Sequence, residues 1–341
     1  ESSQALLFVA ERVARWTLMG VESAAARLPL GEAGASPGPL WLALACALAL
    51  AAVRARRTLT RVLLAAGVSA FLALAPPAEV APPPPRLVVL DVGQGDASVV
   101  QGRRGSLLVD AGSAFPGGDL GRRAVVPALR ALGIQRLDLV VASHADLDHR
   151  GGLPAVLAAL PVGAVWIPAG TAEEPAFARL LEAARARAVP VFERGAGSPA
   201  AAIGDLRVTP LWPPGRSGVR SRNDSSLVVR VEVGGRRVLL PGDVEAAAEA
   251  ALVAGGAELR AEVLVLPHHG SRSSSSRAFL EAVAPELAVA SAPWQGRFGM
   301  PHREVLERAR AAGIPVWWTG RDGAVLVGLG QPLVAWGLRE P

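Results

Sequence analysis

The sequence predicts a layered α/β domain preceded by apolar helices. From Arg86 onward, short apolar strands alternate with helices rich in Ala, Leu and Arg, and acidic or histidine side chains directly follow several of these strands. Before residue 80 the chain contains long apolar runs, and the whole sequence is 51% hydrophobic with a mean hydropathy of +0.33. This value is high for a wholly soluble protein and predicts a membrane-associated part.

The N-terminal part contains an amphipathic helical pattern and two uncharged apolar runs. The amphipathic pattern covers Gln4–Leu28, and the apolar runs are Leu40–Val53 and Val62–Ala75. Each run is shorter than the roughly 20 residues that span a bilayer, so buried core helices are the alternative. We expect a membrane hairpin, because no nearby soluble segment could cover both runs on all sides. A signal peptide is disfavoured, since two such runs occur and neither is N-terminal.

The charges between these runs predict an orientation. If the runs span a membrane, the arginines within residues 54–61 should lie on the cytoplasmic side, which places all later residues outside the cytoplasm. The Pro-rich stretch Pro76–Pro85 is a stiff spacer and marks a domain boundary. We therefore expect a membrane part at residues 1–80 and a separate domain at residues 86–341.

Composition restricts the possible partners and the possible metal ligands. All 35 basic residues are Arg, the formal net charge is +5 and the isoelectric point is near 11.0, which permits a nucleic-acid partner without demanding one. The single Cys46 excludes an internal disulfide and a Cys-based zinc site. Glu1 stands in place of an initiator Met, which indicates a fragment or a processed chain.

The expected elements of the domain follow from short apolar runs and from helical Ala/Leu/Arg patterns. The expected strands are 87–91, 97–101, 106–110, 137–142, 164–167, 206–211, 226–233, 237–240, 263–266 and 287–290. The expected helices are 122–132, 154–160, 175–187, 245–254, 275–282 and 303–312.

A cluster of possible metal ligands follows the strand expected at 137–142. His144, Asp146, Asp148 and His149 form an HxDxDH pattern, and two glycines then let the backbone turn tightly into the next helix. Imidazole nitrogens and carboxylate oxygens suit Zn, Mn or Fe, and four of them on one turn can address two ions. The alternative is a solvated, N-capping acidic turn with incidental histidines.

Other possible ligands also follow apolar strands. Asp110 follows the apolar run in "SLLVDAG". Asp243 follows the one in "RVLLPGD", and His268 and His269 follow the one in "AEVLVLPHHG". Each of them alone would more often be a cap or a turn residue. Their repetition together with the HxDxDH turn predicts a metal site at the strand ends.

These motifs, in this order, resemble the metallo-β-lactamase superfamily. The resemblance covers nearly all of residues 86–341 and rests on "LLVDAG", "SHADLDHRGG", "LLPGD" and "LPHHGS". Within the superfamily, "LDVGQGDA", "RNDSSLVV", "HHGSRSSSS" and "GMPHREVLERARAAGIPVWWTGRDGAV" are most similar to the C-terminal domain of the ComEC family of DNA-internalisation competence proteins. The resemblance implies a four-layer αβ/βα sandwich with the metal site at one edge, preceded by apolar, transmembrane helices.

The resemblance also implies a site for two divalent ions, Mn²⁺ or Zn²⁺. The implied ligands are His144, Asp146, Asp148, His149, Asp243 and one of His268 and His269. Asp148, His149 and the His268/His269 ligand would hold one ion, His144 and Asp146 the other, and Asp243 would bridge them. Asp110 would orient the HxDxDH turn.

Two positions depart from the superfamily pattern. Asp146 replaces the middle histidine of HxHxDH, which gives a harder ligand set and should favour Mn²⁺ over Zn²⁺. No histidine occupies the usual intermediate ligand position, where "RNDSS" stands instead, so Asn223 is expected to support the site or to contact substrate. We expect Gln94 and Asp96 of "GQGD" to form a turn near the metal edge, because the motif lacks nucleotide-loop spacing.

The expected activity is hydrolysis of a DNA phosphodiester. Two ions about 3.5 to 4 Å apart can generate hydroxide and stabilise the attacking and leaving oxygens, with Asp148, Asp243 and His302 in catalytic positions. Ser271, Arg272 and His302 are expected to contact phosphate, and a surface histidine at a helix start is the alternative for His302. A DNA-uptake protein at the cell membrane, acting with other uptake proteins, would thus degrade the strand that is not imported.

Two other function classes remain open at this point. The same metal core could hydrolyse a small ester, a lactone or a β-lactam, because one fold serves several chemistries. The chain could also be a non-catalytic membrane receptor or channel component for DNA with a degenerate metal site.

Overall fold

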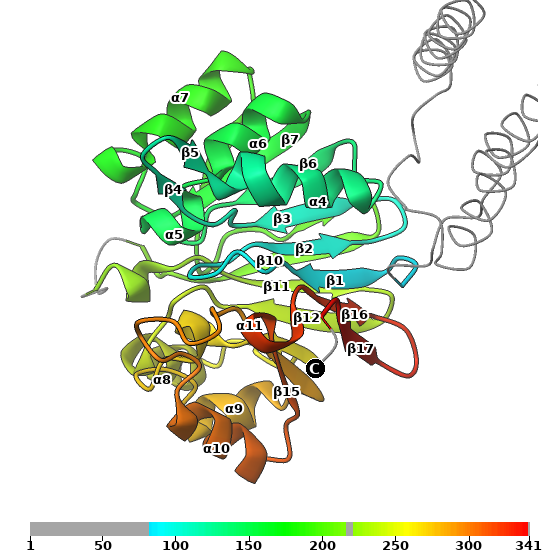
Figure 1. The fold of residues 1–341 in the computed structure, drawn as a ribbon. Coiled ribbons are helices and arrows are strands. Elements are labelled where there is room, and N and C mark those ends of the chain that lie inside the picture. Colours follow the sequence, from blue (N-terminus) through cyan, green and yellow to red (C-terminus); the bar gives the residue numbers. More distant parts are fainter. Residues whose placement is uncertain (1–81, 216–220, 340–341) are drawn as a thin grey trace, which may run out of the picture. The chain divides into compact units, whose positions relative to one another are not determined.

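The computed structural model describes residues 82–215 and 221–339. Two β-sheets pack face to face in this part of the chain, and helices cover the outer face of each sheet (Figure 1). Helices α4, α6 and α7 lie over one sheet, and α8, α9 and α10 lie over the other. The layers are therefore helix, sheet, sheet and helix, as the family resemblance implies.

The first sheet has eight strands in the order β17-β16-β1-β2-β3-β6-β7-β8. Their bounds are β1 Arg86–Val89, β2 Ser98–Gln101, β3 Ser106–Val109, β6 Leu137–Val141, β7 Val162–Pro168, β8 Val191–Arg194, β16 Val325–Gly328 and β17 Val334–Gly337. The strands from β3 to β8 pair in parallel, and the others pair antiparallel.

The second sheet has seven strands in the order β15-β14-β13-β12-β11-β10-β9. Their bounds are β9 Ala201–Ile203, β10 Leu206–Trp212, β11 Val228–Val233, β12 Arg236–Leu240, β13 Val263–Val265, β14 Leu287–Ala290 and β15 Val316–Trp318. Strands β12 to β15 are parallel. A small hairpin of β4 (Ala114–Phe115) and β5 (Gly118–Asp119) stands apart from both sheets.

The helices connect these strands. They are α4 Val126–Ala131, which continues a π-helical turn at Gly121–Val125, α5 Leu147–Arg150, α6 Leu153–Ala159, α7 Ala178–Ala186, α8 Ala246–Ala254, α9 Arg277–Val283, α10 Arg303–Ala311 and α11 Thr319–Asp322. Short 3₁₀ turns cover Pro175–Phe177, Asn223–Ser225 and Pro267–Gly270.

Alternating side chains on the strands build two apolar layers. On β12, Val238 and Leu240 point into the core between the sheets, whereas Leu239 points toward the layer under α8, α9 and α10. On β13, Val263 and Val265 join the inter-sheet core while Leu264 faces the helices. This period of two on strands buried on both faces produces the nearly continuous apolar runs in the sequence.

The described elements include every strand and helix expected from the sequence, with small shifts at their ends. Among the strands that were not expected, β8 and β9 are edge strands with exposed or half-buried residues and therefore lack an apolar run. The sequence interpretation also missed β16, which is a buried strand inside the first sheet. The two expected membrane-spanning runs and the amphipathic pattern lie outside the described residues. Within residues 82–215 and 221–339, no helix is both long and apolar enough to cross a bilayer.

Candidate metal centre

The HxDxDH motif covers the turn after β6 and the first residues of α5, and it packs directly on the loop after β3. A Cβ atom on Gly152 would lie 2.2 Å from the carbonyl oxygen of Ala111, so only glycine permits this contact. The Ala111 amide donates to the carbonyl of His149 at 2.8 Å. The glycines that end the motif therefore hold its ligands against the "DAG" loop.

Asp110 fixes the start of this turn and the ring of His149. One carboxylate oxygen accepts the Ser143 amide at 2.8 Å, and the other accepts the Ser143 hydroxyl at 2.6 Å. The second oxygen also lies 2.8 Å from Nδ1 of His149. Both residues are fully buried. A proton on Nδ1 satisfies the carboxylate and leaves Nε2 of His149 as the metal-binding nitrogen.

The two histidines after β13 adopt left-handed backbone conformations. The φ angles are 51° at His268 and 57° at His269, which is uncommon for residues other than glycine. The His268 amide donates to the Gly242 carbonyl at 3.1 Å and so ties this strained turn to the "PGD" loop. Such strain is found mainly where a site requires it, and here it directs both rings toward Asp243.

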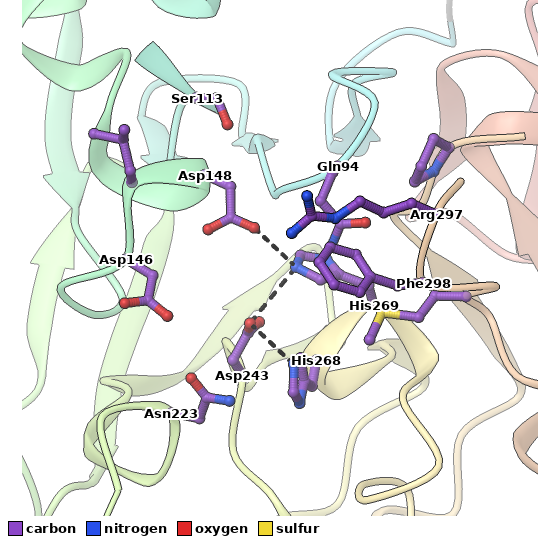
Figure 2. Close-up of a pocket in the computed structure, with 13 residues that line it drawn as sticks. Gln94, Ser113, Asp146, Asp148, Asn223, Asp243, His268, His269, Arg297 and Phe298 are labelled. Atoms are coloured by element: carbon purple, nitrogen blue, oxygen red, sulfur yellow. Dashed lines mark ion pairs between the residues drawn. The ribbon is translucent and has the colours of Figure 1, made fainter. Parts of the chain in front are cut away.

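Asp243 lies at the centre of the cluster (Figure 2). Its Oδ1 is 3.3 Å from Nε2 of His149, and its Oδ2 is 3.5 Å from Nε2 of His269. The Nε2 atoms of His144 and His268 lie 3.8 and 3.9 Å from the same Oδ2. One carboxylate therefore faces four imidazoles from two different segments of the chain.

The two aspartates of the turn face the same space. Oδ2 of Asp146 lies 3.7 Å from Nε2 of His144, and Oδ2 of Asp148 lies 3.8 Å from Nε2 of His269. The structure thus brings together every ligand that the resemblance implies. Of the two candidate histidines, His269 is buried in the cluster, whereas His268 lies at its margin and also contacts Glu245 at 3.3 Å.

Asp96 belongs to this cluster, and the sequence interpretation had assigned it only to a turn. Its Oδ1 is buried and lies 3.6 Å from Nδ1 of His269. The ligand atoms of Asp96, His149, Asp243 and His269 all lie within 4.8 Å of one another. A Cβ atom on Gly95 would lie 2.0 Å from the Asp148 carbonyl oxygen, which explains why "GQGD" carries glycine there. The available signal was an acidic residue shortly after an apolar strand.

Two buried ligand atoms that lack hydrogen bonds within the described residues indicate that the cluster fits a divalent ion. Nε2 of His144 and Oδ1 of Asp243 are buried and have no hydrogen-bond partner there. Buried polar atoms are nearly always satisfied, and these two face each other's side chains across a few ångströms. Nitrogen and carboxylate donors at this spacing suit Zn²⁺ or Mn²⁺. The residues are therefore those of a divalent metal site.

The buried charges shift one another's pKa values. Burial alone would lower the pKa of His269, but Asp243 and Asp96 outweigh it and raise this pKa to about 9. Burial likewise opposes charge on His149, yet Asp243 and Asp110 raise its pKa well above the usual value. Burial would raise the pKa of Asp243, and the surrounding histidines lower it well below the usual range instead. The metal-free cluster thus holds protons on imidazoles that an ion must displace.

Asp146 has a second partner outside the cluster. Its Oδ1 accepts a hydrogen bond from the Arg222 guanidinium at 2.9 Å. His144 and then Arg222 lower the pKa of Asp146, against the opposing effect of burial. Asp146 is therefore ionised and shared between a ligand histidine and an arginine.

The ligands open into a cleft of about 730 Å³, a size suited to a small-molecule or nucleotide ligand. The lining residues are Gln94, Ser113, Asp146, Leu147, Asp148, Asn223, Asp243, His268, His269, Pro293, Arg297, Phe298 and Met300. Asn223 lies within this lining, as expected for a residue near substrate. Phe298 and Arg297 had not been singled out from the sequence.

Three expected substrate contacts lie beside the cleft and are not among its lining residues. Nδ1 of His302 accepts the Arg272 amide at 3.1 Å, so His302 ties the serine-rich loop to the start of α10. The Ser271 hydroxyl is within 2.9 Å of the Ser273 hydroxyl. His302 stands directly before α10, and its Nδ1 is engaged within the protein.

Comparison with known proteins shows the family of this chain. Residues 90–294 match the Metallo-beta-lactamase superfamily. The chain belongs to this superfamily. ComE operon protein 3 of Bacillus subtilis is 33% identical over 250 residues, which cover 70% of this chain and 32% of that protein. Competence protein ComA of Neisseria gonorrhoeae is 36% identical over 246 residues, which cover 72% of this chain and 32% of that protein.

These relatives confirm the resemblance to the ComEC family, and the chain spans about a third of their length. Two solved structures are similar to part of this chain. YhfI from Bacillus subtilis has a TM-score of 0.46 at 15% identity, covering 69% of this chain and 96% of that one. CmlA, a diiron β-hydroxylase from Streptomyces venezuelae, has a TM-score of 0.47 at 18% identity, covering 81% and 59%.

Proposed function

We propose that the domain is a metal-dependent phosphodiesterase that hydrolyses DNA during natural transformation and degrades the strand that is not imported. The observation that carries this proposal is the position of Asp243, whose oxygens lie 3.3 to 3.9 Å from Nε2 of four histidines in an open cleft. The word competence in the name of ComA, together with the resemblance to the ComEC family, supports a role in DNA uptake and therefore DNA as the substrate.

The site would hold two divalent ions, with Mn²⁺ preferred. In this proposal Asp148, His149 and His269 hold one ion, and His144 with Asp146 holds the other. Asp243 would serve both, because its Oδ1 lies near Nε2 of His149 and its Oδ2 lies near Nε2 of His144 and of His269. Such ions supply a hydroxide nucleophile at neutral pH and stabilise developing negative charge on phosphoryl oxygens.

The protein residues have separate tasks in this proposal. Asp110 lies next to Nδ1 of His149, and Asp96 lies next to Nδ1 of His269. Each carboxylate would keep the proton of its imidazole on Nδ1, so that the unprotonated Nε2 faces the ions. Asp148, whose side chain is 30% exposed, faces the cleft and can orient the attacking water. The buried Asp243 lies between the two histidine groups and would keep the ions together.

Residues outside the ligand set would position the phosphate backbone. Asn223 lines the cleft, while Ser271 and Arg272 follow the lining residue His269 in the sequence and His302 follows the lining residue Met300. Hydroxyl, guanidinium and imidazole groups are common phosphate contacts. We propose that they orient the strand without taking part in bond cleavage.

The proposed location is the cell membrane, with this domain on the non-cytoplasmic side and in contact with other uptake proteins. It rests on the two apolar runs before residue 80 and on the arginines within residues 54–61. Protease added to intact spheroplasts should digest the domain. Full protection until lysis would reverse the orientation.

The activity itself is tested with the purified full chain, labelled single-stranded and double-stranded DNA, and a series of divalent ions. We expect product release that depends on the ion and is highest with Mn²⁺. Parallel assays with a lactone and a β-lactam test the small-substrate alternative. Hydrolysis of these compounds without any DNA cleavage would reject the nuclease proposal, and DNA binding without hydrolysis of any substrate would favour a non-catalytic receptor.

A further inference from the structure

An exposed aromatic side chain lies on the wall of the cleft opposite the HxDxDH turn. The segment between β14 and α10 contributes Pro293, Arg297, Phe298 and Met300 to the lining, and Phe298 is 46% exposed. Figure 2 shows Arg297 and Phe298 across the cleft from Asp146 and Asp148. A single exposed apolar side chain is common on protein surfaces, so what singles out Phe298 is its position in the lining of the cleft beside the metal ligands.

Arg297 makes this wall positive as well as aromatic. Its guanidinium carbon lies 4.4 Å from the centroid of the Phe298 ring. Across residues 82–215 and 221–339, no carboxylate forms an ion pair with Arg297. A planar cation over a ring, with its charge unmatched, complements a group that is both planar and anionic.

The segment is held in place at both ends. The Trp318 indole donates to the Ala292 carbonyl at 2.7 Å, and the Trp294 ring stacks on Trp318 with centroids 5.0 Å apart. At the other end, the His302 amide donates to the Gly270 carbonyl at 2.9 Å, directly after the ligand histidines. The aromatic wall is therefore anchored relative to the metal ligands, and a ligand need not order it on binding.

We propose that Phe298 and Arg297 form a stacking platform for an unpaired nucleobase of the strand whose phosphodiester reaches the metal centre. This inference rests on the proposed DNA hydrolysis and adds the form of the substrate. Base faces are open in a single strand or a frayed end, whereas base pairing and stacking bury them in a duplex. Stacking on an aromatic ring tolerates any sequence, because every base has a π-face, and the Arg297 charge can contact the adjacent phosphate.

The test measures binding in chelator, where no cleavage occurs, by fluorescence anisotropy of labelled DNA with the full chain. The probes are a single strand of mixed sequence, the matching blunt duplex and an abasic single strand that has the same phosphates. Phe298→Ala should weaken binding of the single strand about 5- to 50-fold and change binding of the duplex and of the abasic strand less than about twofold. Phe298→Trp should keep single-strand binding near the wild-type level.

Phe192→Ala is the matched control. Phe192 is 40% exposed and has the Arg194 guanidinium 4.8 Å from its ring centroid, but it lies on the edge strand β8 away from the cleft lining. Its removal should leave the affinity for every probe unchanged, and melting curves should show that both alanine variants are folded.

The outcomes separate the platform from the proposed activity. Equal loss for the single strand and the abasic strand, or wild-type single-strand binding by Phe298→Ala, would reject the platform and leave the hydrolysis proposal standing. If the wild-type chain bound none of the three probes, both the platform and DNA as the substrate would be rejected.

Discussion

Asp110 and Asp243 contact opposite edges of the same imidazole. Oδ2 of Asp110 lies 2.8 Å from Nδ1 of His149, and Oδ1 of Asp243 lies 3.3 Å from Nε2 of that ring. The first contact fixes the ring and its tautomer, and the second marks the side on which an ion binds.

Asp110→Asn should therefore weaken metal binding about 10- to 100-fold, because the amide cannot accept the Nδ1 proton and the Ser143 hydrogen bonds equally well. Competition with a chromogenic chelator measures this affinity. Asp205→Asn is the control, since Asp205 accepts two backbone amides at 2.8 and 2.9 Å in an exposed turn outside the cluster. Equal affinities of the two variants would show that Asp110 does not support the site.

Asp96→Asn should act through His269 in the same way. Because Oδ1 of Asp96 lies 3.6 Å from Nδ1 of His269, loss of the carboxylate charge should lower the pKa of His269 toward its usual value. Histidine NMR of the metal-free protein reports that pKa, and the chelator assay reports the affinity, which should fall about 10-fold or more. An unchanged pKa of His269 would contradict the contact.

Metal affinity should increase with pH across the neutral range. The pKa of His269 in the folded, metal-free protein is about 9, above its usual value, so the ring is protonated at pH 7. An ion binds only the neutral ring, so affinity should rise about tenfold per pH unit between 7 and 9, and more steeply because the pKa of His149 is also raised. The stability of the metal-free protein should change with pH in the opposite direction. The protonated His269 ring stabilises the metal-free fold fully below about pH 6.5, and this contribution is lost as the pH rises through 9. Chelator competition at several pH values tests this, and a flat profile would contradict it.

Arg222→Gln should strengthen binding of one ion. The Arg222 guanidinium occupies Oδ1 of Asp146 at 2.9 Å, so this cation competes with an ion for the same carboxylate. The Arg222 side chain is 59% exposed, which limits the gain to about fivefold or less. Titration with Mn²⁺, followed by the EPR signal of the free ion, gives the affinity. Weaker binding would indicate that Arg222 positions Asp146 instead.

The parts of the site that follow strands were predictable from the sequence. Asp110, Asp243 and the two adjacent histidines each come directly after an apolar run, and the parallel strands bring their carboxyl ends to one edge. The HxDxDH turn was recognisable because four potential ligands, two His and two Asp, occur within six residues. Local sequence patterns and the direction of the strands were enough to predict these residues.

The parts that depend on contacts between distant loops were not predictable. Asp96 reaches His269 because Gly95 allows the "GQGD" loop to approach Asp148 closely. The residues of "GQGD" do not by themselves predict this contact. The sequence around Phe298 does not distinguish it from any other loop phenylalanine. Its position on the cleft wall depends on the contacts that anchor Ala292 and His302. The edge strand β8 was missed because it pairs with a neighbour on one side only, and its side chains are exposed or half-buried.

The central claim is that Asp243 joins the ligands into one catalytic metal site, and the most direct measurement compares DNA cleavage by wild type, Asp243→Ala and Asp205→Asn. Labelled DNA, Mn²⁺ and the full chain are used at one pH, with bound metal quantified and folding checked by melting curves. We predict that Asp243→Ala binds less metal and loses cleavage to the level without protein while remaining folded, and that Asp205→Asn cleaves like wild type. Cleavage by Asp243→Ala at the wild-type rate would contradict the account.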